Sequence, residues 1–192
     1  MPSIRDFIGS FNRGELARPN RFTAEVTFPQ LITNNSTTLD CETAELPGLT
    51  YTTAEQKFGS NPIEKYPYHV QFNDANLTFI VREDMDIKKN MDNWMNLISP
   101  NTGYNFNYKK DYAGTITITQ YSLKDNPIYQ VRLIDAYPIS VNQLDLDWSS
   151  EGYHKLTVVF AYTYWERTTG SIGENISGSL LSRWWKTFIK FN

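Results

Sequence analysis

The feature that most constrains the fold is a long apolar run near the C-terminal end of the sequence. Residues 156–165 read LTVVFAYTYW and contain no charged side chain. The side chains of a strand alternate between its two faces. One face would then carry Leu156, Val158, Phe160, Tyr162 and Tyr164, and the other Val159, Ala161 and Trp165. A strand with two apolar faces needs cover on both, so we expect the core on one side and a helix or a neighbouring molecule on the other.

The composition of the 192-residue chain excludes several classes of protein. Aromatic residues make up 15% of it and charged residues 20%, which is typical of a globular protein. A net charge of -3 leaves no basic excess for tight binding to a phosphate backbone. The one cysteine, Cys41, cannot form a disulfide within the chain, and we expect an inert thiol buried in a strand. We expect neither a secretory signal in residues 1–10 nor a membrane span, which needs about 20 apolar residues.

Local sequence patterns predict a mainly β chain with one internal helix. Strands are predicted over residues 21–28, 38–44, 76–82, 115–123, 128–138 and 156–165. Residues 84–98 predict a helix with an apolar stripe formed by Ile87, Met91, Trp94, Met95 and Ile98. A shorter amphipathic helix is expected over residues 3–13, because Gly14 follows its apolar stripe.

The segment from residue 45 to residue 69 has no sustained period. It contains prolines 47, 62 and 67 and glycines 48 and 59. A structureless segment of this length is uncommon inside a compact domain and is usually functional or disordered. It is either a surface loop without a partner or an extended arm that becomes ordered on one. Its apolar residues favour the arm, and the candidate contact residues are Leu49, Tyr51, Phe58, Ile63 and Tyr66.

The sequence predicts neither an enzyme nor a cofactor. The histidines, His69 and His154, lie in predicted loops, and neither has a Ser or Cys in a recognisable nucleophile context. There is no CxxC, HExxH or glycine-rich phosphate loop. In a strand, Asp145 and Asp147 would direct their carboxylates to one side, as a metal-binding or catalytic pair or as a solvated face. The solvated face is favoured, and the opposite face would carry Leu144, Leu146 and Trp148.

Four blocks of the sequence follow one another in an order typical of one protein family. They are GELARPNRFTAEV (Arg18, Pro19, Asn20, Phe22), CETAELPG (Cys41, Leu46, Pro47, Gly48), DNWMN (Trp94), and LDLDW with the closing YWE (Leu144, Asp145, Trp148, Tyr164, Trp165, Glu166). In this order the blocks resemble the tail tube protein of T4-type contractile-tailed bacteriophages. Related folds occur in the tubes of type VI secretion systems and other injection devices.

The resemblance implies a fold, an assembly and a set of partners. The fold would be two packed antiparallel sheets in a small barrel-like sandwich with a flanking helix, over residues 1–166. Members of the family form six-membered rings around a lumen, and the rings stack into a tube, with residues 47–66 reaching the adjacent ring. The implied partners are the sheath, the tape measure protein, the baseplate tube-initiator and the tail terminator. DNA would pass without tight binding, in a virion tail that is assembled in the host cytoplasm and makes no stable contact with membrane.

Residues 167–192 continue beyond the shorter members of this family. They read as a linker followed by an amphipathic helix, in which the candidate contact residues are Leu181, Trp184, Trp185 and Phe188. This helix could dock on its own or a neighbouring subunit, contact the sheath or another tail component, or bind membrane.

Two other functions remain open at this point. One is a tube-initiating baseplate component, or an injection-system tube component, of the same fold. The other is a monomeric β-sandwich module that binds a ligand such as a carbohydrate by stacking on Trp148, Trp165 or Tyr164.

Overall fold

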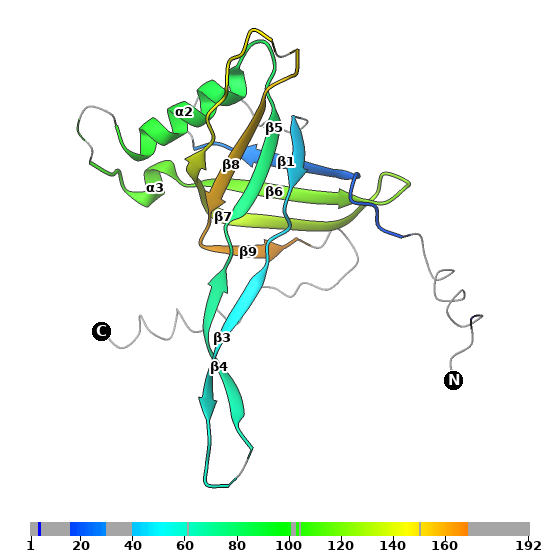
Figure 1. Ribbon diagram of the computed structural model, residues 1–192, viewed down its shortest axis with the longest axis vertical. Helices are drawn as coiled ribbons and strands as arrows, with labels where there is room; N and C mark the ends of the chain where they lie inside the picture. The colour runs from blue at the N-terminus through cyan, green and yellow to red at the C-terminus, as the bar shows by residue number, and fades with distance from the viewer. Residues whose placement is uncertain are drawn as a thin grey trace, which may run out of the picture.

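The computed structural model shows a mainly β chain with a helix at one side (Figure 1). It describes residues 4, 16–29, 40–60, 62–100, 103, 105–149 and 151–168. The helix expected over residues 3–13 lies outside these residues except for Ile4. The candidate contact residues Leu181, Trp184, Trp185 and Phe188 also lie outside them, as does all of residues 169–192.

All strand pairs are antiparallel. A seven-stranded sheet has the order β1-β6-β7-β8-β5-β2, with β9 beside β7, and β3 pairs with β4 in a separate hairpin. The strands are β1 Phe22–Thr27, β2 Cys41–Ala44, β3 Leu49–Gln56, β4 Glu64–Phe72, β5 Ala75–Ile80, β6 Gly114–Tyr121, β7 Pro127–Val141, β8 Lys155–Ala161 and β9 Tyr164–Arg167. The helices are α2 Asp86–Ile98 and α3 Lys109–Tyr112.

The long strand β7 belongs to two layers. Its first part pairs with β6 and β9, and its last part, Tyr137–Val141, pairs with β8. Between them Asp135 has a φ of 53°, a conformation that Asp tolerates better than most residues. The first layer is therefore β1-β6-β7-β9 and the second is β7-β8-β5-β2, and the two cross in Figure 1. This confirms the prediction of two antiparallel sheets in a sandwich-like fold.

The core lies between the two layers, and the alternation of side chains explains it. Ala24 and Val26 of β1 are fully buried, whereas Glu25 between them is exposed. The buried side chains of the first layer also include Ile116, Ile118, Val131 and Leu133, and those of the second layer are Ala75, Leu77, Phe79, Leu156, Val158 and Phe160. Burial of this apolar surface is the main stabilising contribution to the fold.

Helix α2 closes one side of the core through Trp94. This side chain is fully buried, and its ring centre lies 5.3 Å from that of Phe28 and 5.9 Å from that of Phe160. Its Nε1 donates a hydrogen bond of 2.7 Å to the carbonyl oxygen of Tyr112. A Cβ at Gly114 would lie only 2.8 Å from the Trp94 ring and 2.6 Å from the Thr27 oxygen, so glycine permits this close packing. The predicted helix is confirmed.

The apolar run over residues 156–165 forms two strands, so the prediction of one strand was wrong. Strand β8 ends at Ala161 and β9 begins at Tyr164. At the break, the N–H of Thr163 donates a hydrogen bond to the Ile134 oxygen (3.0 Å). The Thr163 hydroxyl, Oγ1, donates a second hydrogen bond to Oδ2 of Asp135 (3.2 Å). The chain thus passes from the second layer to the first, and its apolar residues are shared between different surroundings.

Residues 49–72 also differ from the prediction, because they form a regular hairpin. The pairing runs from Leu49 with Phe72 to Gln56 with Glu64, and Tyr68 is the extra residue of a bulge. Nearly all of its residues are exposed, so no buried face produces an alternating pattern in the sequence. The expectation of a segment without regular structure was wrong for this reason.

Candidate assembly surfaces

The described residues contain no arrangement suited to catalysis. Burial raises the pKa of the Cys41 thiol to about 12, and its Sγ donates to the Thr43 oxygen at 3.2 Å. At neutral pH this thiol is therefore protonated and a poor nucleophile. No group of three or more His, Cys, Asp and Glu side chains in this part of the chain could hold a metal ion. Its helices are all too short or too polar to cross a membrane.

The β3–β4 hairpin extends from the body along the longest axis of the molecule (Figure 1). The predicted contact residues are all exposed: Leu49 40%, Tyr51 54%, Phe58 63%, Ile63 55% and Tyr66 47%. Tyr68 and Val70, which the sequence analysis missed, are exposed by 70% and 45%. A two-stranded ribbon with no buried face is marginally stable in water. This apolar ribbon is therefore a candidate contact surface for another molecule.

The two edges of the first layer form a second candidate surface. Within the described residues, β1 pairs only with β6 and β9 only with β7. The N–H of Tyr121 donates to the Arg21 oxygen (2.9 Å), which places the backbone groups of Phe22, Ala24 and Val26 on the outer side of β1. On β9, the buried Nε1 of Trp165 has no acceptor in this part of the chain. Open strand edges of this kind pair readily with other chains.

The face of the first layer that points away from the core is rich in hydroxyl groups. The strand register places Thr23 beside Thr119, Glu25 beside Thr117, Thr27 beside Thr115, and Arg132 beside Glu166. The charged residues at these positions are Glu25, Arg132 and Glu166, so this face has almost no net charge. We call it the threonine face.

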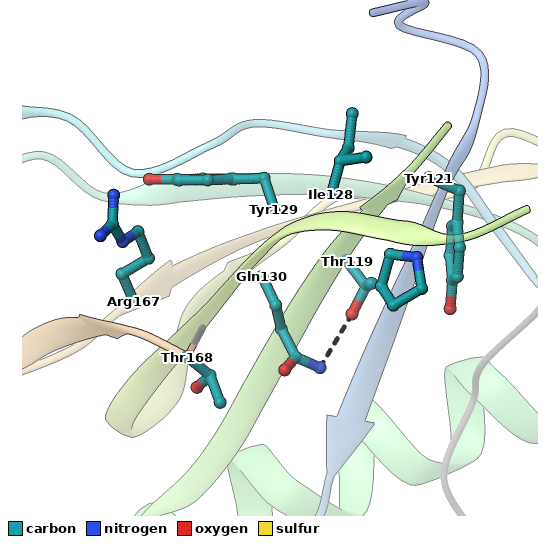
Figure 2. A pocket seen from close by; sticks show the side chains of 8 residues that line it. Thr119, Tyr121, Ile128, Tyr129, Gln130, Arg167 and Thr168 are labelled. Carbon is teal, nitrogen blue, oxygen red and sulfur yellow. Dashed lines mark hydrogen bonds between the residues drawn. The ribbon is translucent and has the colours of Figure 1, made fainter. Parts of the chain in front are cut away.

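A shallow cavity of about 330 Å³ lies at one end of the threonine face (Figure 2). It is lined by Thr119, Tyr121, Pro127, Ile128, Tyr129, Gln130, Arg167 and Thr168. Within it, Nε2 of Gln130 donates a hydrogen bond of 3.1 Å to Oγ1 of Thr119, as Figure 2 shows. The lining contains no carboxylate, histidine or cysteine that could act as a base or nucleophile. The cavity is thus part of the polar surface of this face.

The connection between β7 and β8 carries the third surface, which we call the 144–154 loop. Trp148 is fully exposed, Leu146 is 88% exposed and Tyr153 is 61% exposed. Asp147 accepts hydrogen bonds from the N–H of Ser149 (3.0 Å) and from its Oγ (2.9 Å), and these bonds lower the pKa of Asp147. These residues do not form a strand, because the Asp147 side chain competes for the backbone. The paired carboxylates considered for a strand therefore do not arise, and Asp145 and Asp147 are both exposed.

The residues of the four sequence blocks are distributed over these surfaces rather than gathered in one site. Arg18, Pro19 and Asn20 precede β1, where the Arg18 oxygen accepts from the N–H of Arg21 (3.3 Å) and from Gln120 Nε2 (3.3 Å). Cys41 begins β2, and the half-exposed Leu46 leads through Pro47 and Gly48 into the hairpin. Trp94 lies in the core, Leu144, Asp145 and Trp148 in the loop, and Tyr164, Trp165 and Glu166 in β9.

Comparison with solved structures identifies the same fold in components of contractile injection systems. One match is the anti-feeding prophage (AFP) baseplate, 15% identical with a TM-score of 0.64, covering 81% of this chain and 97% of that chain. Another is the PVC sheath/tube terminator of an extracellular contractile injection system. It is 16% identical with a TM-score of 0.63, and the match covers 81% of this chain and 99% of that chain. A chain of the PVC sheath-tube complex is 14% identical with a TM-score of 0.59, and the match covers 84% of this chain and 97% of that chain.

The comparisons at the level of sequence give one positive result. No curated protein matches the chain. A family model described as phage tail tube protein matches residues 15–168, from the turn before β1 to the end of β9. This match spans both layers of the sandwich, the hairpin and α2, and most of the chain. The chain belongs to the phage tail tube protein family.

Proposed function

We propose that this chain is the repeating subunit of the tube in a contractile phage tail, where six copies close a ring and rings stack around a lumen that conducts DNA. Membership of the tail tube family supports a structural tube subunit of the virion tail. The observation that carries the proposal is the first layer, a four-stranded sheet that is open at both edges within the described residues.

Ring closure would use the two open edges. Strands β1 and β9 lie at opposite edges of the layer, so β1 of one copy can pair with β9 of the next. Such a contact joins two different surfaces, and it closes when the rotation between copies divides a full turn. Six copies is the number that the family resemblance implies. Closure would pair the outward-pointing backbone groups of Phe22, Ala24 and Val26 with those of a neighbour.

The threonine face would line the lumen. Closure into a barrel puts one face of the layer inside, and the other face is already buried in the core of the subunit. Glu25, Arg132 and Glu166 leave this face with a small negative balance. DNA is held by many Lys and Arg contacts to phosphate, and a face without them lets it slide.

The hairpin would reach the adjacent ring. Both of its faces are exposed in the single subunit, and its apolar side chains would be covered once a second ring is present. Each subunit then meets several neighbours, so weak individual contacts add up to a stable tube. The proposed partners are the sheath outside, the tape measure protein in the lumen, the baseplate tube-initiator and the tail terminator. The chain acts as a conduit and not as an enzyme, without a cofactor or a stable membrane contact, and assembles in the host cytoplasm.

Negative-stain electron microscopy of the purified full chain tests this proposal. We expect rings with sixfold symmetry, or hollow tubes built from them, at concentrations at which the subunits associate. A mutation of the open edge, Ala24→Pro, should prevent rings, because proline removes the N–H that β1 would donate to the neighbour. A strictly monomeric wild-type chain at high concentration would contradict the proposal.

A further inference from the structure

Two exposed apolar surfaces in the described part of the chain lie at opposite ends of its longest axis (Figure 1). The described residues of the hairpin tip, 57–60, 62 and 63, lie at one end, and those of the 144–154 loop, 144–149 and 151–154, lie at the other. Two different surfaces at opposite ends of a subunit generate an open head-to-tail stack when they fit each other. The question is therefore whether their chemistry is complementary.

The 144–154 loop is a preorganised surface. The two hydrogen bonds from Ser149 hold the Asp147 turn, and Trp148 projects from it into solvent. The end of the loop is also fixed, because Lys155 pairs with Glu42 at 2.7 Å and its Nζ lies 5.2 Å from the centre of the Tyr153 ring. An exposed tryptophan on a fixed turn can bind without a large loss of conformational entropy.

An open depression lies beside this tryptophan. Its volume is about 430 Å³, and its lining includes Leu146, Trp148 and Tyr153. The loop carries Asp145, Asp147 and Glu151, and residues 144–154 contain no Lys or Arg. A ligand for this surface should thus combine a large apolar side chain with a cation.

The hairpin tip has this combination. Its sequence from residue 57 is KFGSNPI, with the cation Lys57 next to Phe58, and it contains no acidic residue. Phe58 and Ile63 are 63% and 55% exposed. Gly59 has a φ of 60°, which turns the chain sharply and leaves Phe58 at the end of the ribbon. An aromatic side chain on such a tip is shaped to enter a depression on another molecule.

We propose that the hairpin tip of one copy docks onto the 144–154 loop of the next copy along the stack. Phe58 enters the depression beside Trp148, and Lys57 lies among the acidic side chains of the loop. This inference rests on the proposed function and adds the receiving surface to it. The contact is heterologous, so it propagates along one axis and gives the tube a direction.

Chemical cross-linking of the full chain tests the contact. The substitutions Ser60→Cys and Glu151→Cys place one thiol at the tip and one on the loop. They leave Phe58, Lys57 and Trp148 unchanged and remove one of the three acidic side chains, so that Asp145 and Asp147 remain for Lys57. With a short bis-maleimide, we expect the assembled double variant to give a ladder of covalent multimers on a denaturing gel. Each single variant should give almost none. Burial raises the pKa of the Cys41 thiol to about 12, so the wild-type chain is the blank.

A second pair of cysteine substitutions tests whether another segment of the chain, residues 179–192, binds the 144–154 loop instead of the hairpin tip. Residues 179–192 contain Arg183, Lys186 and Lys190 beside apolar residues, so they too have the chemistry that this surface would bind. A ladder from Glu151→Cys with Trp184→Cys, and none from the tip pair, would overturn the proposal. Tubes that form normally but give no cross-link at the tip pair would also overturn it. If the wild-type chain forms neither rings nor tubes, the proposed function itself has failed.

Mutation of the tryptophan provides a measurement that does not depend on added thiols. In Trp148→Ala, rings should still form, but the amount of tube recovered by sedimentation should fall by about tenfold or more, as for a central aromatic contact. Trp148→Phe keeps an aromatic ring and should recover most of the tube. Normal tube yield from Trp148→Ala would contradict the inference.

Discussion

The sandwich body and the β3–β4 hairpin are both built from antiparallel strands, yet they use their side chains in opposite ways. In the body, Phe79, Trp94 and Phe160 are fully buried. In the hairpin, Tyr66 is 47% exposed and Tyr68 is 70% exposed. Backbone pairing is regular in both regions. The difference shows that a strand held by backbone pairing alone keeps its side chains free to bind another molecule. A strand buried between two layers uses its side chains to stabilise the fold.

The largest expected effect comes from making the same substitution in the two regions. Trp94→Ala should lower the free energy of unfolding by about 3–5 kcal/mol, because it opens a cavity and removes the hydrogen bond to the Tyr112 oxygen. Trp148→Ala should change it by no more than about 0.5 kcal/mol, since the side chain is fully exposed.

Urea unfolding of the unassembled subunit, followed by circular dichroism, measures both values. An equal decrease in the free energy of unfolding for both variants would contradict the difference between the two regions. It would also mean that Trp148 is packed within the free subunit, and the loop would then no longer be a free docking surface.

A smaller effect is expected from shortening the hairpin. Replacing residues 55–65 with Asn-Gly joins Ala54 to Tyr66, which face each other in the ribbon, through a turn suited to a hairpin. The free energy of unfolding should change by less than about 1 kcal/mol, because the described residues among those removed are exposed and belong to no part of the core. Rings should persist and stacking should be lost. Thermal unfolding and electron microscopy check the two halves of this prediction, and normal tubes would show that the ribbon is dispensable.

The smallest effect concerns Cys41 at the margin of the body. Its thiol has an ordinary pKa of 9.0, and burial raises it to about 12. At pH 8, iodoacetamide should therefore alkylate the folded chain at least about a hundredfold more slowly than the urea-unfolded chain.

The same shift makes stability depend on pH. The folded chain favours the protonated thiol, so its stabilisation is complete below the unfolded value of 9.0 and falls as the pH rises towards 12. The wild-type chain should lose stability faster than Cys41→Ala over this range. If the two chains lost stability in parallel as the pH rises, the Cys41 thiol would be exposed to water in the folded chain.

The sequence predicted the body better than the surfaces, for a physical reason. Strand β1 and helix α2 each bury one face, and burial leaves a period in the sequence that can be recognised. The hairpin buries neither face and leaves no period, although its apolar residues marked it as unusual. The run over residues 156–165 misled because its break at Thr163 depends on the bend at Asp135, far away in the sequence. The Asp147 turn depends on a side-chain hydrogen bond that the alternation of Leu144, Leu146 and Trp148 conceals.

The way the hairpin joins the body has a mechanical consequence. Strand β4 ends at Phe72 and β5 begins at Ala75, so the ribbon continues almost directly into a buried strand. Tension applied to the hairpin therefore runs along β5, while the hydrogen bonds that hold β5 to β2 and β8 lie across the direction of pull. These hydrogen bonds share the force and must rupture together, in shear, rather than one after another. A tube joined through such ribbons would resist stretching along its axis.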